Sequence, residues 1–220
     1  MKKWKRVKAG KDPYRDLARK LGLRSRAYFK LKDIDKRYRV LQAGYTVLDL
    51  GAYPGGWLQY SSEKVGLDGE VIGIDIREIE EFIDKPNIHT IKGDIFSDKT
   101  IQALSDYLIS KEIDTILSDL SPNITGIWEL DIERIYEYNL RTLDYVNKFL
   151  KKGGNLVLKS FSGKYSNKLR KKLGKMFKYV YVYKPRASRK RSAEEYFICK
   201  GYRPPKRDKN SLKEQSLLTP

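Results

Sequence analysis

Short apolar runs alternate with longer amphipathic stretches along most of the chain. The apolar runs predict buried strands, at residues 46–50, 70–75, 88–94, 113–119 and 155–161. The stretches between them repeat apolar positions at helical spacing and predict helices, starting at Trp57 and covering 99–110 and 131–151. Strands and helices that alternate in this way predict an α/β fold with a mostly parallel, doubly wound sheet.

The two ends of this pattern differ from its centre. Asp12-Pro13 is typical of a helix start, and Ser25 caps a second expected helix over 26–38. Near the other end a lysine-rich helix is expected at 166–174, before strands at 177–183 and 194–200. Because no helix separates those last two strands, we expect a C-terminal antiparallel hairpin. The resulting domain map has one domain at 12–202, between a basic N-terminal arm at 1–11 and a polar, flexible tail at 203–220.

A glycine-rich segment follows the first strand and has the outline of a ligand pocket. The sequence runs from Val47 through Gly51, Gly55 and Gly56 to Trp57. Glycines let a ligand approach the backbone, and the next helix offers unpaired N–H groups. The spacing does not fit the Gly-x-Gly-x-x-Gly dinucleotide pattern. A tight strand-to-helix connection without a ligand is the alternative interpretation.

Three acidic residues end strands at the same expected sheet edge, namely Asp75, Asp94 and Asp119. A carboxylate after the second strand suits ribose hydroxyls, and one after the third can accept from an exocyclic amine. Together they favour an adenosine ligand. Helix capping is the alternative role for each of them.

The net charge of the chain indicates the class of molecule that it binds. With 46 Lys and Arg against 28 Asp and Glu, the net charge of +18 indicates a polyanionic partner. The chain has one cysteine, Cys199, and one histidine, His89, so we expect core or structural roles for both, no disulfide and no metal site. No apolar run reaches the ~20 residues of a membrane span, and the start lacks a signal-peptide core. We therefore expect a monomeric, cytoplasmic protein.

Four motifs resemble those of the FtsJ/RrmJ (RlmE) family of S-adenosylmethionine-dependent RNA ribose 2′-O-methyltransferases. They are Asp49-Leu-Gly-Ala-Tyr-Pro-Gly-Gly-Trp57, Ser118-Asp-Leu-Ser-Pro-Asn123, Leu158-Lys-Ser-Phe161 and Ser192-Ala-Glu-Glu-Tyr196. The resemblance covers about Ser25 to Gly201 and implies a Rossmann-like methyltransferase fold. It implies S-adenosylmethionine contacts from Gly51, Pro54, Gly55, Gly56, Trp57, Asp75, Asp94 and Asp119. It also implies a catalytic tetrad of Lys30, Asp119, Lys159 and Glu194. Tyr53 departs from the small residue expected in the glycine-rich loop.

Methyl transfer to a ribose hydroxyl needs alignment of the reacting atoms and removal of the hydroxyl proton. Lys159 is the expected proton acceptor, which requires its neutral form. Burial and the second ammonium of Lys30 favour that form, whereas Asp119 and Glu194 favour the charged form. In the alternative role, protonated lysines stabilise the developing alkoxide. A lysine that merely extends from a strand end to water is the structural alternative.

The expected RNA contacts are basic residues beside the catalytic edge, namely Arg24, Arg26, Arg186, Arg189, Lys190 and Arg191. They can hold phosphates without reading sequence. The resemblance implies a uridine in the A-loop of large-subunit ribosomal RNA as the target. A tRNA anticodon-loop ribose 2′-O-methyltransferase and a non-catalytic RNA-binding protein remain as alternatives. A nicotinamide-dependent dehydrogenase is disfavoured by the glycine spacing and the charge.

Overall fold

A computed structural model describes residues 12–109, 111–122, 125–189 and 192–205 of the chain. These residues form a seven-stranded sheet in the order β3-β2-β1-β4-β5-β7-β6. The strands are β1 Thr46–Leu50, β2 Glu70–Asp75, β3 Ile88–Lys92, β4 Ile113–Ser118, β5 Leu150–Phe161, β6 Phe177–Tyr183 and β7 Glu194–Tyr202. The first five strands are parallel, and β7 is antiparallel to both β5 and β6. The arm at 1–11 and the tail from 206 lie outside the described residues.

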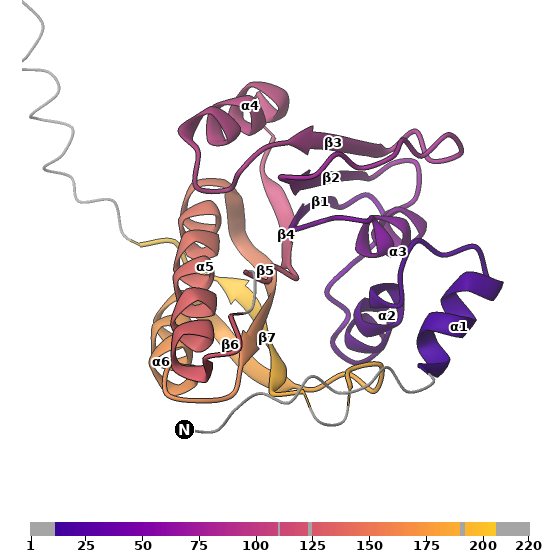
Figure 1. Cartoon of the computed structure of the whole chain (residues 1–220). Helices are drawn as coiled ribbons and strands as arrows, with labels where there is room; N and C mark the ends of the chain where they lie inside the picture. The colour runs from indigo at the N-terminus through magenta and orange to yellow at the C-terminus, as the bar shows by residue number, and fades with distance from the viewer. Residues whose placement is uncertain (1–11, 110, 123–124, 190–191, 206–220) are drawn as a thin grey trace, which may run out of the picture.

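Helices cover both faces of the sheet, as Figure 1 shows. They are α1 Pro13–Lys20, α2 Ala27–Tyr38, α3 Gly56–Val65, α4 Asp98–Leu108, α5 Trp128–Phe149 and α6 Ser166–Met176. One core cluster joins α4, α5 and α6 to one face, and a second joins α2 and α3 to the other. The doubly wound α/β prediction is confirmed.

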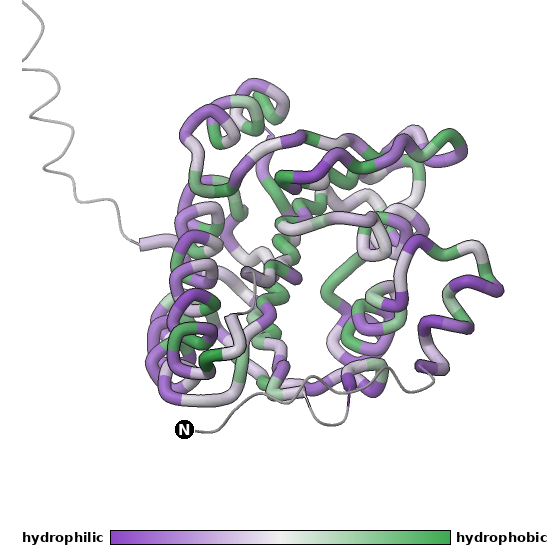
Figure 2. The backbone as a smooth tube through the Cα atoms, in the orientation of Figure 1, coloured by the Kyte–Doolittle hydropathy of each residue, from purple (hydrophilic) through white to green (hydrophobic). Residues whose placement is uncertain are grey.

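The central strands carry the core because they are buried on both faces. In β1 and β2 every residue after the first is buried. Figure 2 shows hydrophobic segments gathered in the middle of the sheet, whereas polar and apolar residues alternate along the outer helices. Each fully buried Leu or Ile side chain contributes roughly 1.5–3 kcal/mol. This rigid centre holds the strand ends in place for the site below.

The boundary between the long helix and the fifth strand differs from the prediction. The helix begins at Trp128, ends at Phe149 and is followed at once by β5. The predicted glycine stop at Gly153 and Gly154 is therefore wrong, because both glycines lie within the strand. The ladder with β4 is irregular there, and a Cβ on Gly154 would lie 2.9 Å from the Asp114 carbonyl oxygen. Gly154 allows this close backbone approach, and Gly153 adopts φ +85°, so neither glycine ends the helix.

The predicted C-terminal hairpin is confirmed, but it joins the sheet through its second strand. β7 pairs with β5 on one side and β6 on the other, so β6 is the edge strand. As a result, β7 begins at the sheet edge where the parallel strands end. Phe161 at the end of β5 pairs with Glu194 at the start of β7.

Within the described residues, no helix has both the length and the apolar character needed to cross a membrane. The same part of the chain contains no group of His, Cys, Asp and Glu arranged to hold a metal ion. Cys199 is buried and unpaired with another cysteine. His89 is not a core residue, since its side chain on β3 is 41% exposed and lies 3.6 Å from Glu70.

Candidate active site

The ends of two neighbouring strands bring Lys159 and Asp119 together. Ser118 on β4 pairs with Leu158 on β5, so the residue after each partner lies at the same sheet edge. The Lys159 Nζ atom is 3.1 Å from Asp119 Oδ1 and donates to the Asp119 carbonyl oxygen at 2.6 Å. Lys159 is 6% exposed. It is thus held inside the site rather than extended into water.

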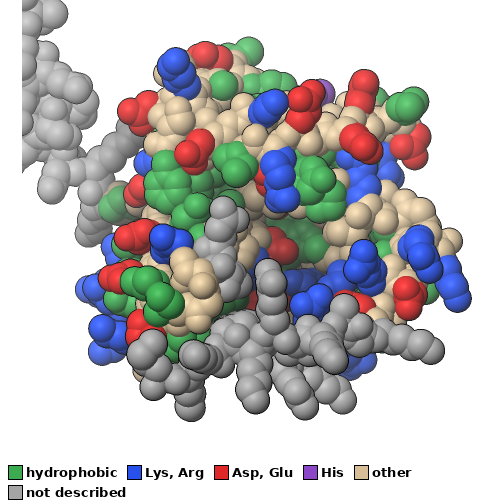
Figure 3. Space-filling view, viewed as in Figure 1, with side chains coloured by type: hydrophobic (Ala, Val, Ile, Leu, Met, Phe, Trp, Pro, Cys, Tyr) green, Lys and Arg blue, Asp and Glu red, His purple; other side chains and the backbone are tan. Residues whose placement is uncertain are grey.

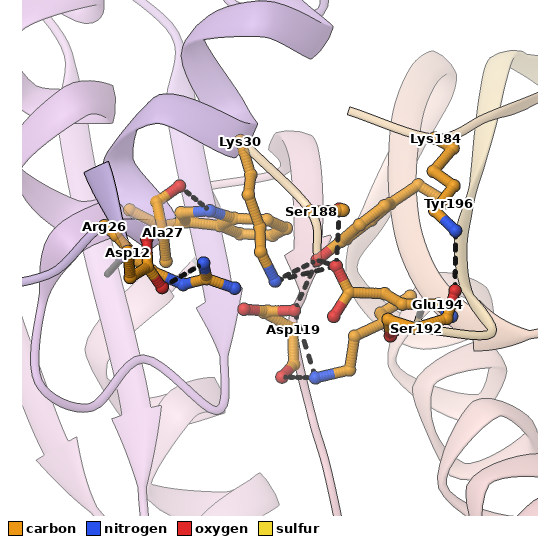
Figure 4. Close-up of polar contacts among 12 residues, drawn as sticks. Asp12, Arg26, Ala27, Lys30, Asp119, Lys184, Ser188, Ser192, Glu194 and Tyr196 are labelled. Carbon is orange, nitrogen blue, oxygen red and sulfur yellow. Dashed lines mark hydrogen bonds and ion pairs between the residues drawn. The ribbon is translucent and has the colours of Figure 1, made fainter. Parts of the chain in front are cut away.

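Two more members of the predicted tetrad arrive from distant parts of the chain. Lys30 extends from α2, and its Nζ lies 2.8 Å from Glu194 Oε1 at the start of β7. In Figure 4, Lys30 and Glu194 point toward Asp119. The structure therefore gathers Lys30, Asp119, Lys159 and Glu194 into one cluster of two ammonium groups and two carboxylates.

Tyr196 connects the two ion pairs, although the sequence alone predicted no role for it. Its hydroxyl lies 2.8 Å from Asp119 Oδ1, 3.2 Å from Glu194 Oε1 and 3.1 Å from Lys30 Nζ. Burial, then Asp119 and Glu194, raise the pKa of the Tyr196 hydroxyl, so it stays a neutral donor. Its place two residues after Glu194 was the available signal, because alternate strand residues share a face.

The surroundings of Asp119 favour its charged form. Burial alone would raise the pKa of Asp119, but the ammonium groups of Lys159 and Lys30 outweigh it and lower that pKa. Glu194 also accepts from the Ser188 hydroxyl at 2.8 Å. The site therefore pairs each buried ammonium with an anionic oxygen, as a buried charge requires.

The glycine-rich loop begins α3 beside this cluster. Gly55 is the N-cap of α3 with φ +107°, and Gly51 has φ +79°, both unfavourable for other residues. A Cβ on Gly56 would lie 2.1 Å from Ser25 Oγ. Trp57 is buried, and its indole N–H donates to the Ala27 carbonyl oxygen at 2.8 Å. The loop is therefore pressed against α2, and Trp57 links the two helices.

A buried carboxyl beneath this loop has no partner. Both oxygens of Asp49, on β1, lack a hydrogen-bond partner in the described structure, and the side chain is 1% exposed. Burial, then Asp119 and Asp75, raise the pKa of Asp49 well above its usual range. Three acids thus converge here, and a cation bound among them would relieve their repulsion.

The Asp49→Asn variant tests whether the buried, unpartnered carboxyl of Asp49 destabilises the fold. Because its folded-state pKa is raised, wild-type stability falls as pH rises above the unfolded value of ~3.9 toward the folded one. We expect the variant to gain on the order of 1–3 kcal/mol over wild type at pH 8. Urea unfolding from pH 4 to 9 measures the difference. A gap that does not change with pH would contradict the assignment.

Asp75 lies at the predicted strand end and is held from two sides. It is buried, and it accepts from the Tyr53 backbone N–H at 3.1 Å and the Arg77 backbone N–H at 2.9 Å. The Arg77 guanidinium lies 3.9 Å from the centre of the Tyr53 ring. The unexpected Tyr53 is therefore held in the glycine-rich loop by Asp75, with Arg77 stacked over its ring.

Asp94 is less enclosed than the sequence suggested. β3 ends at Lys92, so the prediction that the strand runs to Asp94 is wrong by two residues. Asp94 is exposed, and its Oδ1 accepts from the Phe96 N–H at 3.0 Å. Its carboxylate thus shapes the turn after β3 while remaining open to a ligand.

Of the residues predicted to contact RNA, two are held by other residues of the chain and two are exposed. Arg24 lies 3.4 Å from the centre of the Phe82 ring and donates to the Glu81 carbonyl oxygen at 2.7 Å, so it holds the loop after β2. Arg26 is paired with Asp12 at 2.5 Å. Arg186 and Arg189 are exposed. Lys190 and Arg191 lie outside the described residues.

The surface is hollowed at the centre of the face in Figure 3, between α5 on the left and α2 and α3 on the right. Lys and Arg side chains are frequent on the part of that face over α1 to α3. The ends of β1 and β4 lie near the centre of the same view (Figure 1). Open α/β sheets bind ligands at this position.

Comparison with known proteins agrees with this arrangement. Residues 23–202 match the family model described as FtsJ-like methyltransferase. A protein of Methanocella arvoryzae named ribosomal RNA large subunit methyltransferase E is 44% identical over 192 residues, which cover 87% of this chain and 73% of that protein. A protein of the same name from Methanosphaera stadtmanae is 41% identical, over 92% of this chain and 98% of that protein. A crystal structure from Plasmodium falciparum, described as a ribosomal RNA methyltransferase, has a TM-score of 0.73 and 31% identity, over 81% of this chain and 98% of that one.

Proposed function

The chain belongs to the FtsJ-like methyltransferase family, and we propose that it methylates a ribose 2′-hydroxyl of large-subunit ribosomal RNA with S-adenosylmethionine as donor. The observation that carries this proposal is the cluster of Lys159, Asp119, Lys30 and Glu194 beside the glycine-rich loop. The names of the relatives support ribosomal RNA as the substrate class. A uridine in the A-loop is the specific target that we propose.

The residues around the loop fit the proposed cofactor. S-adenosylmethionine supplies an electrophilic methyl group on a cationic sulfonium. After burial, the charges of Asp119 and Asp75 raise the pKa of Asp49, and these two carboxylates form an anionic environment that suits this cation. We assign Asp75 to the ribose hydroxyls of the cofactor. These hydroxyls would replace the Tyr53 and Arg77 backbone N–H groups as donors to its carboxylate. The adjoining loop and helix start contain the other residues expected to contact the cofactor, namely Gly51, Pro54, Gly55, Gly56 and Trp57.

Lys159 is the residue that we assign to the proton of the target 2′-hydroxyl. Its Nζ is fixed by Asp119 through both a carboxylate and a carbonyl oxygen. Lys159 acts as a base only in its neutral form, so a proton must leave the cluster before each turnover. Glu194 and Lys30, which are paired with each other at 2.8 Å, orient the ribose. Tyr196 positions both carboxylates.

Incubating the purified chain with methyl-labelled S-adenosylmethionine and RNA tests the proposal. The substrates are large ribosomal subunits, their naked RNA, and total tRNA. Digestion to nucleosides should place the label on a ribose of the large-subunit RNA. Label on tRNA alone would replace the proposed substrate, and label on a base would contradict the reaction. Binding without any transfer would favour a non-catalytic RNA-binding protein.

Asp94 is the residue that we assign to the adenine amine, and Asp94→Ala is expected to weaken S-adenosylmethionine binding by about tenfold or more. Turnover at saturating cofactor should stay near that of wild type, because Asp94 does not contact the tetrad. Titration calorimetry measures the affinity. Asp98→Ala is the matched control, since Asp98 is exposed in the first turn of α4. Equal affinities of the two variants would remove Asp94 from the pocket.

We propose a monomer in the cytoplasm as the working form. The tetrad is completed within one chain, since Lys30, Asp119, Lys159 and Glu194 contact one another without a second copy. Sedimentation of the active protein at assay concentration tests this, and activity confined to a dimer would contradict it.

A further inference from the structure

The edge strand β6 presents a row of tyrosines on the face of the sheet that α2 covers. Tyr179, Tyr181 and Tyr183 are alternate residues and therefore share one face. Tyr38, the last residue of α2, packs against two of them, with ring centres 5.2 Å from Tyr181 and 5.6 Å from Tyr183. We call these four residues the tyrosine strip.

The outer half of the strip is open to solvent. Tyr179 is 48% exposed and Tyr181 is 42% exposed. Their rings are nearly parallel, at 20°, with centres 6.4 Å apart. That separation is close to twice the ~3.4 Å rise per nucleotide of a stacked strand. The core does not need these two rings, yet both present aromatic surface at a spacing that suits bases.

Cations lie among the rings of the strip. The Lys178 ammonium is 5.2 Å from the centre of the Tyr179 ring. The Arg37 guanidinium is 5.4 Å from the Tyr183 ring and 5.7 Å from the Tyr38 ring. Surfaces that bind single-stranded nucleic acid combine aromatic and cationic groups in this way. The chain as a whole is also positively charged, with a net charge of +18.

The strip leads to the catalytic cluster. Tyr183 is the direct partner of Tyr196 in the β6–β7 ladder. The Tyr196 hydroxyl contacts Asp119 and Glu194. From there the strip extends four residues along β6 to Tyr179, roughly 13 Å at the usual strand rise. A strand of RNA whose ribose lies at Lys159 can therefore continue onto this edge.

We propose that the tyrosine strip binds a single-stranded segment of the substrate RNA beside the target nucleotide. Tyr179 and Tyr181 stack on bases, and Lys178 and Arg37 contact phosphates. This inference rests on the proposed function for the identity of the RNA. A protein strand added to β6 is the less suitable occupant, because Lys178 lies within the strand, Lys184 follows it, and edge lysines oppose such pairing.

RNA affinity of the full chain, measured without cofactor by fluorescence anisotropy, tests the proposal. The probes are a labelled uridine-rich 20-nucleotide RNA without secondary structure and a labelled A-loop hairpin. The double variant Tyr179→Ala, Tyr181→Ala is expected to bind both about tenfold or more weakly. The matched double variant Tyr179→Phe, Tyr181→Phe should bind as wild type does, because the ring and not the hydroxyl stacks.

Salt dependence separates the stacking groups from the charged ones. The alanine variant should keep the wild-type slope of log affinity against log salt. Lys178→Gln should reduce that slope by about one unit. Wild-type affinity in the alanine variant would overturn the proposal.

Cross-linking tests the strip without any change in the chain. Ultraviolet irradiation of the wild-type complex should attach RNA to Tyr179 or Tyr181, as identified by mass spectrometry of the peptides. Cross-links confined to other regions would contradict the proposal even where the alanine variant fails to fold. A dimer that the tyrosine changes dissociate, with RNA affinity intact, would instead assign the strip to contact between two copies.

These outcomes are independent of catalysis. If RNA receives no methyl group but its binding depends on the two rings, the proposed function fails and the strip stands. If methyl transfer occurs and binding ignores the rings, the strip fails and the proposed function stands.

Discussion

A Lys159→Ala variant is expected to lose about 10²–10⁴-fold in the rate of methyl transfer, the usual contribution of a positioned general base. S-adenosylmethionine affinity should stay within a few-fold of wild type, since Lys159 contacts Asp119 rather than the glycine-rich loop. Single-turnover rates at saturating RNA, with calorimetry for the cofactor, measure the two effects. Near-normal transfer would remove Lys159 from the mechanism.

Lys159→Arg distinguishes the two roles that a lysine can have here. Arginine keeps the positive charge but does not lose its proton in proteins. If Lys159 accepts the hydroxyl proton, the arginine variant should be as slow as the alanine variant. If Lys159 instead stabilises an alkoxide by its charge, arginine should restore part of the rate.

An Asp119→Asn variant is expected to lose both activity and stability. Asp119 is the carboxylate partner of Lys159, and its pKa is lowered chiefly because Lys159 and Lys30 oppose the effect of burial. Removing one partner of a buried ion pair destabilises proteins by about 3–5 kcal/mol. Urea unfolding at pH 7 measures this loss, and the methyl-transfer assay should show a rate reduced by at least about 10²-fold.

The sign of the pH effect identifies the cause. A carboxyl with a lowered folded-state pKa stabilises the protein above its unfolded pKa, and this contribution disappears as pH falls through the folded value. The stability gap between wild type and Asp119→Asn should therefore shrink below about pH 4. Asp144→Asn is the matched control, because Asp144 pairs with Arg141 at 3.3 Å while its own side chain is 60% exposed. We expect it to lose only about 1 kcal/mol. Equal losses of stability in the two variants would mean that burial of the Lys159–Asp119 pair does not cause the loss.

The amino-acid sequence by itself determined the secondary structure and the composition of the tetrad. Hydrophobic periodicity is a local property, so the strands through Ser118 and most helices follow it within a few residues. The family resemblance also implied that Lys30, Asp119, Lys159 and Glu194 share one site, and the structure brings all four together. The expected hairpin followed from the missing helix between two strands.

Only the tertiary structure decided what lies around those residues. The insertion of β7 between β5 and β6 places Tyr196 among the four tetrad members, and the same insertion leaves the tyrosines of β6 at the edge. Burial left Asp49 without a partner, and packing drew Arg24 from the expected RNA surface onto Phe82. The physical reason is that strand pairing and side-chain burial depend on residues far apart in the chain, whereas periodicity and capping depend on neighbours.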